Sequence, residues 1–438
     1  MKDSLPESSE VTGLQQAAVD PVAASAAVEF VLTFAQVGHD AGYPTADLEE
    51  RLGALANAVG LEAPQVSATP TIIDLSLGAL PHQRTYAVRV RPTVVDLDSI
   101  ARLDDLVHEV LDGRLTVDEA LTKLTDISAH PLRRRWFVEV SAYALAGAAV
   151  TPVLGGGWRE LVAGGVVGAF VGGVALSAGH SVKAEPMVAP LAAVVASFGA
   201  AVLAKLGLRA STDVVTLAAL VTFLPGMALT IGVRELATQH LQSGVANTAN
   251  ALVQLLGLVV GVAVGRSIAT SWFGTTKAGV PDTGFSGVHI LAAVAAGIAF
   301  TVTLRAQSKA APVMCSATVL AILTYTAGKG LLGAPAGVFV AALAIGLCGG
   351  LAGFWLRRSP LVFIVPGVLM LVPGSAGFNS ILQLLTGQTV SGVDAGFDTF
   401  VTAMSIAYGL MVSAVVLPRR FTELSSRGER GPVFRNDP

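Results

Sequence analysis

The sequence predicts an α-helical polytopic membrane protein, with about ten transmembrane helices in two inverted five-helix repeats and an N-terminal cytoplasmic α+β domain. Three observations lead to this fold class. Of the 438 residues, 53% are hydrophobic and only 13% are charged, whereas soluble proteins carry about 25% charged residues. Most acidic residues precede Pro131, so the polar and apolar parts of the chain are separate. Two short motifs recur at one constant distance within the apolar part.

The two ends of the chain are polar. Residues 1–20 are acidic and have neither the basic start nor the apolar stretch of a signal peptide. We expect them to form a disordered leader and the chain to begin in the cytoplasm. Residues 421–438 are expected to form a disordered cytoplasmic tail.

Residues 21–132 are expected to form the cytoplasmic α+β domain, which has an ordinary domain size. Apolar residues recur at helical spacing up to about Gly60, and Thr45, which follows a Gly-Tyr-Pro break, suits the N-cap of a second helix. Thr116 and Glu119 match the pattern of a capping box. The other elements expected here are β-like segments at Gln65–Leu77 and Thr85–Arg91 and helices around Ile100–Leu111 and Val117–Ile127.

Residues that carry catalytic or metal chemistry are sparse. The histidines of the predicted domain fit no metal-ligand spacing, and the chain has no nucleophile elbow or phosphate loop. We therefore expect no enzyme, no metal and no cofactor, with hydrolysis by His39 together with Asp40 or Asp74 as an alternative. Cys315 and Cys348 lie in apolar runs and predict no disulfide framework. The net charge of −3 gives no support for a nucleic-acid partner.

Ten apolar runs are long enough to be read as membrane spans, each of which needs about 20 mostly apolar residues. Lys and Arg are more frequent on the side that holds the N-terminus, which favours cytoplasmic positions for both termini. We group the runs into two units, residues 133–270 and residues 284–420. The runs are 136–154, 160–178, 187–206, 213–232, 245–265, 286–306, 312–332, 334–356, 360–373, which is short, and 397–417.

An internal repeat connects the two units. Leu224-Pro225-Gly226 resembles Val372-Pro373-Gly374, and Ser243-Gly244-Val245 recurs as Ser391-Gly392-Val393. The offset is the same for both motifs, since 373 − 225 = 148 and 391 − 243 = 148. We therefore predict a duplication with five spans in each unit. Because five is odd, the second copy enters the membrane upside down, as in transporters whose substrate site lies at the repeat interface.

The Pro-Gly breaks in the spans point to a transport path. Proline in mid-helix leaves backbone groups unpaired, which membrane proteins tolerate only where protein or a water-filled cavity satisfies them. Polar residues cluster beside the breaks, and polar residues inside a membrane are usually functional. Simple kinks, an interfacial Arg234–Glu235 pair and a loop position for Asp394 are the alternatives. The candidates for the substrate and ion path are Pro225, Gly226, Arg234, Glu235, Asn247, Asn250, Pro366, Gly367, Pro373, Gly374, Asn379, Asp394 and Asp398.

From about residue 25 to 418 the chain resembles the threonine/serine exporter family. In the N-terminal part the resemblance rests on Gly38–Pro44 (GHDAGYP), Thr69–Ile72, Val95–Leu97 and Gly113–Ala120; in the membrane part it rests on Leu224–Gly226, Glu235-Leu236, Ser243-Gly244, Pro373-Gly374 and Ser391-Gly392. The resemblance implies ten spans, a soluble N-terminal domain and export of threonine and serine driven by the proton gradient. Some relatives resemble this chain cut in two at the repeat boundary.

The resemblance also implies the partners and the location. It implies a multi-pass protein of the cell membrane that handles threonine, serine and protons within the lipid bilayer, with a homo-oligomer as a further expectation. Glu235 and Asp398 are the carboxylates expected to contact the substrate ammonium or to exchange a proton. Family members often carry a basic residue where this chain has Asn247, and two-chain relatives are connected with dicarboxylate export. A dicarboxylate exporter, a channel and a membrane-embedded hydrolase therefore remain alternatives.

Overall fold

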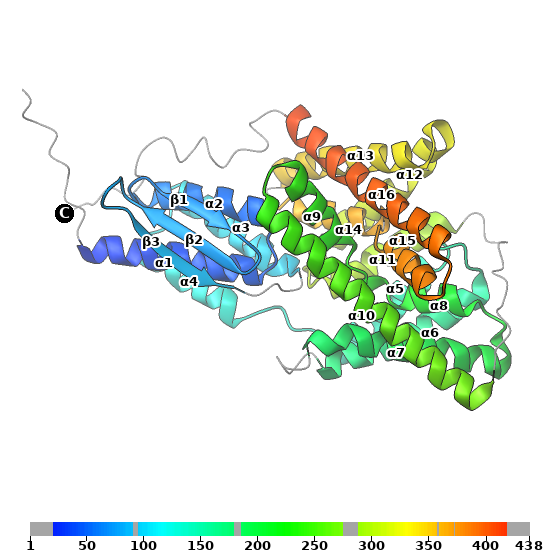
Figure 1. Ribbon diagram of the computed structural model, residues 1–438. Coiled ribbons are helices and arrows are strands. Elements are labelled where there is room, and N and C mark those ends of the chain that lie inside the picture. Colours follow the sequence, from blue (N-terminus) through cyan, green and yellow to red (C-terminus); the bar gives the residue numbers. More distant parts are fainter. Residues whose placement is uncertain are drawn as a thin grey trace, which may run out of the picture.

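The computed structural model describes residues 21–90, 95–178, 185–274, 288–356, 359–371 and 373–417. Figure 1 shows an elongated molecule, with a smaller N-terminal part at one end and a larger bundle of helices at the other. The predicted leader 1–20 and the predicted tail 421–438 lie outside the described residues.

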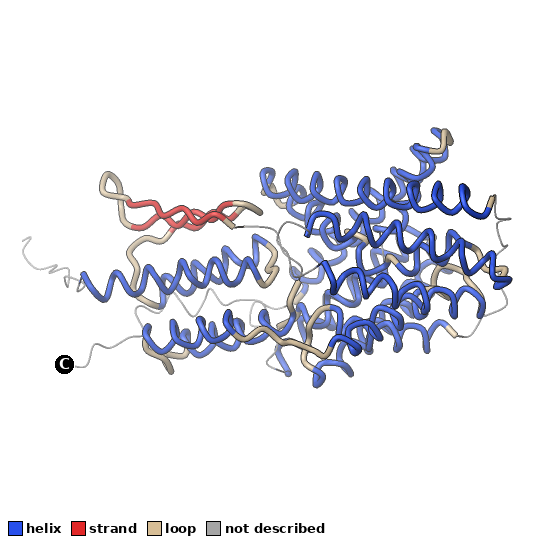
Figure 2. Tube along the Cα trace, turned by 90° about the horizontal axis from the view of Figure 1, so that it is seen from below, coloured by secondary structure: helices blue, strands red, loops and turns tan. Residues whose placement is uncertain are grey.

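The N-terminal part combines helices with one antiparallel sheet. Its elements are α1 (Pro21–Asp40), α2 (Thr45–Ala58), β1 (Gln65–Ala68), β2 (Ile72–Leu77), β3 (Arg84–Arg89), α3 (Leu97–Leu111) and α4 (Val117–Ala129). The strands pair in the order β1-β2-β3, with Ser67 opposite Asp74 and Asp74 opposite Ala87. The sheet covers one side of the helices (Figure 2). Alternate residues of β2, Ile73 and Leu75, are buried beneath it, as the period of two in a strand requires.

Local predictions for this part are confirmed in some places and wrong in others. The capping box of Thr116 and Glu119 is present at the start of α4. The β-like segment Gln65–Leu77 is two strands rather than one, because Thr69 N donates to Ile72 O at 2.8 Å and closes a turn. Thr45 is not an N-cap, since Pro44 holds that position and the Thr45 hydroxyl bonds elsewhere.

A buried ion pair joins α2 to α3. Arg51 Nε donates to Asp104 Oδ1 at 2.7 Å, and the Tyr43 hydroxyl donates to the same oxygen at 2.6 Å. Burial, followed by the Asp104 carboxylate, raises the pKa of Tyr43 well above its ordinary value, so this hydroxyl stays a donor. The network ties together the two helices whose N-termini face the membrane part.

Removing the shared carboxylate is expected to loosen both helices. Asp104→Ala leaves the Arg51 guanidinium buried without its charge partner, which costs about 3–5 kcal/mol. Amide hydrogen exchange of α2 and α3 in the full-length protein should then accelerate by about two orders of magnitude or more. Asp126→Ala is the control, because it removes only the largely exposed contacts of Asp126 with Arg102 and His130. Equal exchange in the two variants would contradict this account of the network.

The remaining described residues are a bundle of apolar helices. Its elements are α5 (Trp136–Val150), α6 (Trp158–Ala178), α7 (Glu185–Leu203), η1 (Ala204–Leu208), α8 (Thr212–Ala219), η2 (Val221–Phe223), α9 (Gly226–Ala237), α10 (Leu241–Phe273), α11 (His289–Thr303), η3 (Ser308–Ala310), α12 (Ala311–Leu332), α13 (Ala334–Leu356), α14 (Leu361–Leu371), α15 (Pro373–Leu385) and α16 (Thr389–Val416).

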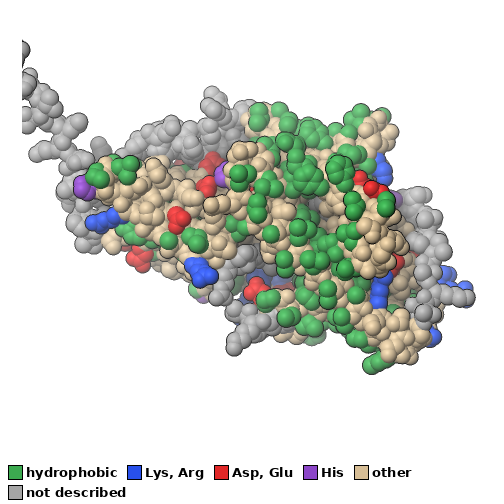
Figure 3. Space-filling model, viewed as in Figure 1, with side chains coloured by type: hydrophobic (Ala, Val, Ile, Leu, Met, Phe, Trp, Pro, Cys, Tyr) green, Lys and Arg blue, Asp and Glu red, His purple; other side chains and the backbone are tan. Residues whose placement is uncertain are grey.

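Seven helices of this bundle are long and apolar enough to cross a membrane, or eight if the bent pair Thr212–Ala219 and Val221–Ala237 is one span. α5 and α11 are shorter apolar helices. Hydrophobic side chains cover much of the bundle face seen in Figure 3, whereas charged side chains gather on the N-terminal part and near the edges. The chain is therefore a polytopic helical membrane protein.

Several predicted spans differ from the observed helices. The fifth, 245–265, is part of the longer helix α10 (Leu241–Phe273). The fourth, 213–232, is bent by 51° between α8 and the segment Val221–Ala237. The ninth, predicted to be short at 360–373, belongs to a longer apolar run, Leu361–Leu385. The tenth begins at Thr389 rather than at 397, so Asp394 lies in α16 and not in a loop. Polar residues at these helix ends lower the local hydropathy, so the apolar runs in the sequence predicted helices that are too short.

Positions separated by 148 residues make matching contacts. A Cβ added to Gly244 would lie 2.8 Å from Leu236 N, and a Cβ added to Gly392 would lie 2.9 Å from Leu384 N. The second contact pair follows the first at the same sequence offset, since 392 − 244 = 148 and 384 − 236 = 148. Only glycine permits this close approach of backbones. The crossing of α9 with α10 therefore has its counterpart in the crossing of α15 with α16.

Candidate functional site

The two predicted breaks meet inside the bundle. α9 contacts both α10 and α16, and α15 contacts both α16 and α10, so these two short helices lie between the two long ones (Figure 1). A Cβ added to Gly374 would lie 3.0 Å from Leu224 Cβ and 3.2 Å from Gly226 N. The Pro225-Gly226 break is thus in direct contact with the start of α15.

Only α9 begins at this contact, because α15 continues the apolar run Leu361–Leu385. Pro225 precedes Gly226, the first residue of α9. The unpaired N–H groups and the positive dipole end of a helix lie at its N-terminus. The contact therefore contains the N-terminus of α9 within the apolar bundle, which gives it a preference for negative charge.

A second polar cluster surrounds Glu235, near the C-terminal end of α9. Its side chain is only 3% exposed. The Thr45 hydroxyl donates to Glu235 Oε1, and Asn247 Nδ2 donates to Glu235 Oε2 at 2.7 Å. Both carboxylate oxygens thus have a donor, one from the N-terminal part and one from α10. The predicted neighbours Glu235 and Asn247 are brought together.

Two weaker ion pairs lie beside this cluster. Arg234 reaches Asp47 Oδ1 at 3.2 Å, and His240 Nε2 lies 3.6 Å from Glu49 Oε2. These four side chains are between 22% and 40% exposed, so their ion pairs contribute little stability. Arg234 and Glu235 therefore do not pair with each other as an interfacial ion pair, since each has its own partner in α2.

The N-terminal part also contacts the second half of the bundle. At the start of α3, Leu97 N donates to Leu304 O at 3.0 Å. The Gln307 amide donates to Asp98 Oδ1 at 2.7 Å, and Arg305 lies 3.8 Å from Asp96. α2 contacts the α9–α10 region and α3 contacts the α11–α12 connection. The N-terminal part therefore bridges the two halves on one side of the bundle.

Other predicted path residues lie apart from these two clusters. Pro366 and Gly367 are buried in α14, where a Cβ on Gly367 would lie 3.0 Å from Ile345. Asn250 is half-buried on α10, whereas Asn379, Asp394 and Asp398 are exposed, on α15 and on α16. Glu235 is buried and hydrogen-bonded to Thr45 and Asn247, whereas Asp398 is exposed on α16. The two carboxylates proposed for proton exchange are therefore in different environments.

The candidate path residues chosen from the sequence left out Thr45 and Gln383, although Gln383 lies in the polar cluster that follows the second break. Thr45 was read as a helix cap, although the Gly-Tyr-Pro segment before it carried part of the family resemblance. Gln383 is the counterpart of Glu235, since 235 + 148 = 383. Its Oε1 is buried and, among the described residues, has no hydrogen-bond partner. The repeat offset contained the signal for Gln383, whereas nothing in the sequence placed Thr45 beside Glu235.

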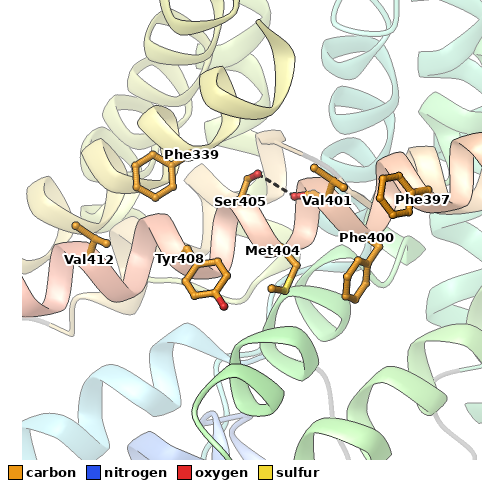
Figure 4. A pocket seen from close by; sticks show the side chains of 8 residues that line it. All are labelled: Phe339, Phe397, Phe400, Val401, Met404, Ser405, Tyr408 and Val412. Atoms are coloured by element: carbon orange, nitrogen blue, oxygen red, sulfur yellow. Dashed lines mark hydrogen bonds between the residues drawn. The ribbon is translucent and has the colours of Figure 1, made fainter. Parts of the chain in front are cut away.

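An apolar groove of about 500 Å³ lies on the outer side of α13 and α16 (Figure 4). Its lining is almost entirely apolar, and the hydroxyl of Ser405 donates to Val401 O at 2.8 Å. A zwitterion would lose its hydration there without new partners. This groove does not suit an amino acid. The lining residues are Phe339, Phe397, Phe400, Val401, Met404, Ser405, Tyr408 and Val412.

Comparison with known families decides the class of the protein. Residues 29–269 match the family model described as "Putative threonine/serine exporter", which is more than half of the chain. The chain belongs to the threonine/serine exporter family. Residues 288–416 match a second model, "Threonine/Serine exporter, ThrE". The gap between the two matched regions coincides with the boundary between the predicted membrane units.

Curated relatives agree with this family. The chain is 23% identical over 402 residues to the "Threonine/serine exporter" of Corynebacterium glutamicum, covering 86% of this chain and 80% of the relative. It is 25% identical over 448 residues to the "Probable threonine/serine exporter" of Mycobacterium tuberculosis, covering 95% and 80%. No solved structure matches the chain. As a member of this exporter family, the protein is a multi-pass amino-acid transporter and not an enzyme.

Proposed function

We propose that the protein exports threonine and serine across the cell membrane and that the proton gradient drives the export. The observation that carries this proposal is the contact between the Pro225-Gly226 break and Gly374, which joins α9 to α15 within the apolar bundle. Broken helices that meet between two membrane units are typical of transporter substrate sites. The names of the two bacterial relatives support threonine and serine as the substrates.

The proposed membrane topology has ten spans in two inverted repeats. Seven long helices, one bent pair and two shorter apolar helices supply ten. The matching glycine contacts at positions 148 residues apart support a duplication. Arg234 and Arg305, both predicted on the cytoplasmic side, contact the N-terminal part. This favours a cytoplasmic position for residues 21–132, with both membrane units, 133–270 and 284–420, anchored beside them.

Substrate handling in this proposal uses both polar clusters. The carboxylate of the amino acid lies at the N-terminus of α9, beside Pro225, Gly226 and Gly374, where the helix dipole favours negative charge. Glu235, with Arg234 and Asn247 around it, lies at the end of α9 that faces the N-terminal part. Glu235 lies about 14 Å along α9 from Gly226, so we propose that the substrate contacts the two clusters one after the other, with Glu235 contacted on the side of the N-terminal part and exchanging the proton there.

The other predicted residues have a supporting place in this proposal. Asn250, Asn379, Asp394 and Asp398 lie on α10, α15 and α16, the helices that surround the break. Carboxylates on a lipid-facing surface are costly. A homo-oligomer that covers the exposed face of α16 would remove Asp394 and Asp398 from lipid, and cross-linking in native membranes tests this part of the proposal.

Efflux from intact cells tests the function. Cells preloaded with a threonine-containing dipeptide should lose threonine faster when they make this protein, and a protonophore should abolish the difference. Serine should compete with threonine, whereas succinate should not. Competition by succinate without any effect on threonine would instead identify a dicarboxylate exporter. Threonine efflux that continues unchanged with the protonophore would exclude proton coupling and favour a channel.

A further inference from the structure

The hydroxyl that contacts Glu235 comes from the N-terminal part and not from the membrane bundle. Thr45 is the first residue of α2, directly after Pro44, and its side chain is buried against Glu235. Residues 190 positions apart in the chain are thus joined by one side-chain hydrogen bond. The side chain that bonds the buried Glu235 carboxylate is thus a threonine. The family of this chain is named for the export of threonine and serine.

The groups around this hydroxyl select hydroxyl-bearing ligands. A carboxylate only accepts hydrogen bonds, and Glu235 accepts one from the hydroxyl and one from the Asn247 amide. A site that is built to bond a hydroxyl rejects an analogue without one, because its buried acceptor is then left unpaired. The same geometry would distinguish threonine from valine, which has nearly the same shape.

The contacts around Thr45 permit its release. The Arg234–Asp47 and His240–Glu49 pairs are partly exposed, so water competes for their charges. Ser243 donates to Ala68 O at 3.2 Å, a single neutral hydrogen bond. The polar contacts around the Thr45–Glu235 hydrogen bond are therefore weak. Because the buried Arg51–Asp104 pair holds α2 on α3 and α3 is bonded to the α11–α12 connection, release of Thr45 requires the N-terminal part to move as a unit.

We propose that Glu235, whose second oxygen is held by Asn247, binds the side-chain hydroxyl of a β-hydroxy amino acid, and that Thr45 occupies this site as an internal substitute while the N-terminal part is docked. Threonine or serine must displace Thr45 to enter. This inference rests on the proposed export of threonine and serine. It assigns the recognised group of the substrate, and it assigns to the N-terminal part a direct role in entry.

Competition by Thr45 has a measurable consequence. A ligand that binds only the undocked form has an apparent dissociation constant equal to the intrinsic one divided by the undocked fraction. If Thr45 occupies the site for about 90% of the time, its removal raises the apparent affinity about tenfold. Thr45→Val keeps the shape of the side chain and removes only the hydroxyl, so packing against Glu235 is preserved.

The test uses the full-length protein in proteoliposomes and measures KM for threonine and serine on the side of the N-terminal part. Thr45→Val should lower both KM values by about three- to tenfold, and Thr45→Ser, which restores a hydroxyl, should return them toward the wild-type values. Ser243→Ala is the matched control, because it removes an interdomain hydrogen bond without touching Glu235. Its KM values should stay at the wild-type level.

Three outcomes of these KM and flux measurements would overturn the inference. Unchanged KM values in Thr45→Val, with wild-type export intact, would mean that Thr45 only packs at the interface, and the proposed function would stand. An equal decrease in Ser243→Ala would mean that any loosening of the interface has this effect. Absence of threonine and serine flux in the wild type, with the protein present in the membrane, would overturn the proposed function together with this inference.

Discussion

Glu235→Ala is expected to lower threonine export by at least about tenfold. The substitution removes the carboxylate that is proposed to bind the substrate hydroxyl and to exchange the proton, and it leaves the Asn247 amide without its acceptor. Each unpaired buried group costs about 1–3 kcal/mol, and about 1.4 kcal/mol corresponds to a factor of ten. Glu235→Gln retains the volume but replaces one acceptor oxygen with an amide that only donates, and it removes the proton-exchanging group. We expect this variant to lose the dependence on the proton gradient.

Initial rates of threonine efflux at equal amounts of membrane-inserted protein measure this effect. Glu185→Ala is the control, because Glu185 is an exposed carboxylate at the start of α7, remote in the chain from both breaks. Wild-type, gradient-dependent export by Glu235→Gln would remove Glu235 from the proton pathway. Wild-type export by Glu235→Ala would also remove it from the substrate path.

Gly374→Val is expected to abolish export although the protein still reaches the membrane. A Cβ at this position would approach Leu224 Cβ to 3.0 Å and the backbone N of Gly226 to 3.2 Å. The further methyl groups of valine have no room there, and overpacking of this kind costs about 1–3 kcal/mol. Because the contact joins Gly374 to the Pro225-Gly226 break, the strain displaces the N-terminus of α9, which forms the proposed carboxylate site.

Gly173→Val provides the matched comparison. Gly173 is an exposed glycine in α6, and a Cβ there would meet nothing within 4 Å. This variant should export at the wild-type rate. If Gly374→Val also exports normally, the contact between the breaks is not part of the transport path, and the proposed position of the substrate site is wrong.

The membrane part was predictable from sequence because a span is defined by the hydropathy of residues that are consecutive in the chain. Apolar runs of about 20 residues define a span wherever they occur, and the offset of 148 identified counterparts such as Gly244 and Gly392, whose backbone contacts match in the structure. The capping box at Thr116 and Glu119 depends on residues three positions apart, and it was also predicted correctly. The longer run Leu361–Leu385 was missed because polar residues such as Asn379 and Ser380 interrupt its hydropathy.

The site itself depends on contacts that no local pattern contains. Thr45 and Glu235 are 190 residues apart, and the turn-like segment before Thr45 suggested a cap rather than a contact with the membrane part. The sequence reading placed Glu235 and Asp398 in one polar cluster, because both follow repeat motifs. In the structure Glu235 is buried, whereas Asp398 is exposed on α16. Helix rotation about its own axis separates such residues, and a single sequence without a tertiary partner does not define that rotation.

Flux of threonine through the purified full-length protein tests the central claim most directly. The protein is reconstituted in proteoliposomes that contain threonine, and an imposed pH difference is then applied or collapsed. We predict threonine flux that requires the pH difference, that serine inhibits, and that valine and succinate do not inhibit. Threonine flux that is equally fast without the pH difference, or inhibition by succinate and not by serine, would contradict a proton-driven exporter of hydroxyl-bearing amino acids.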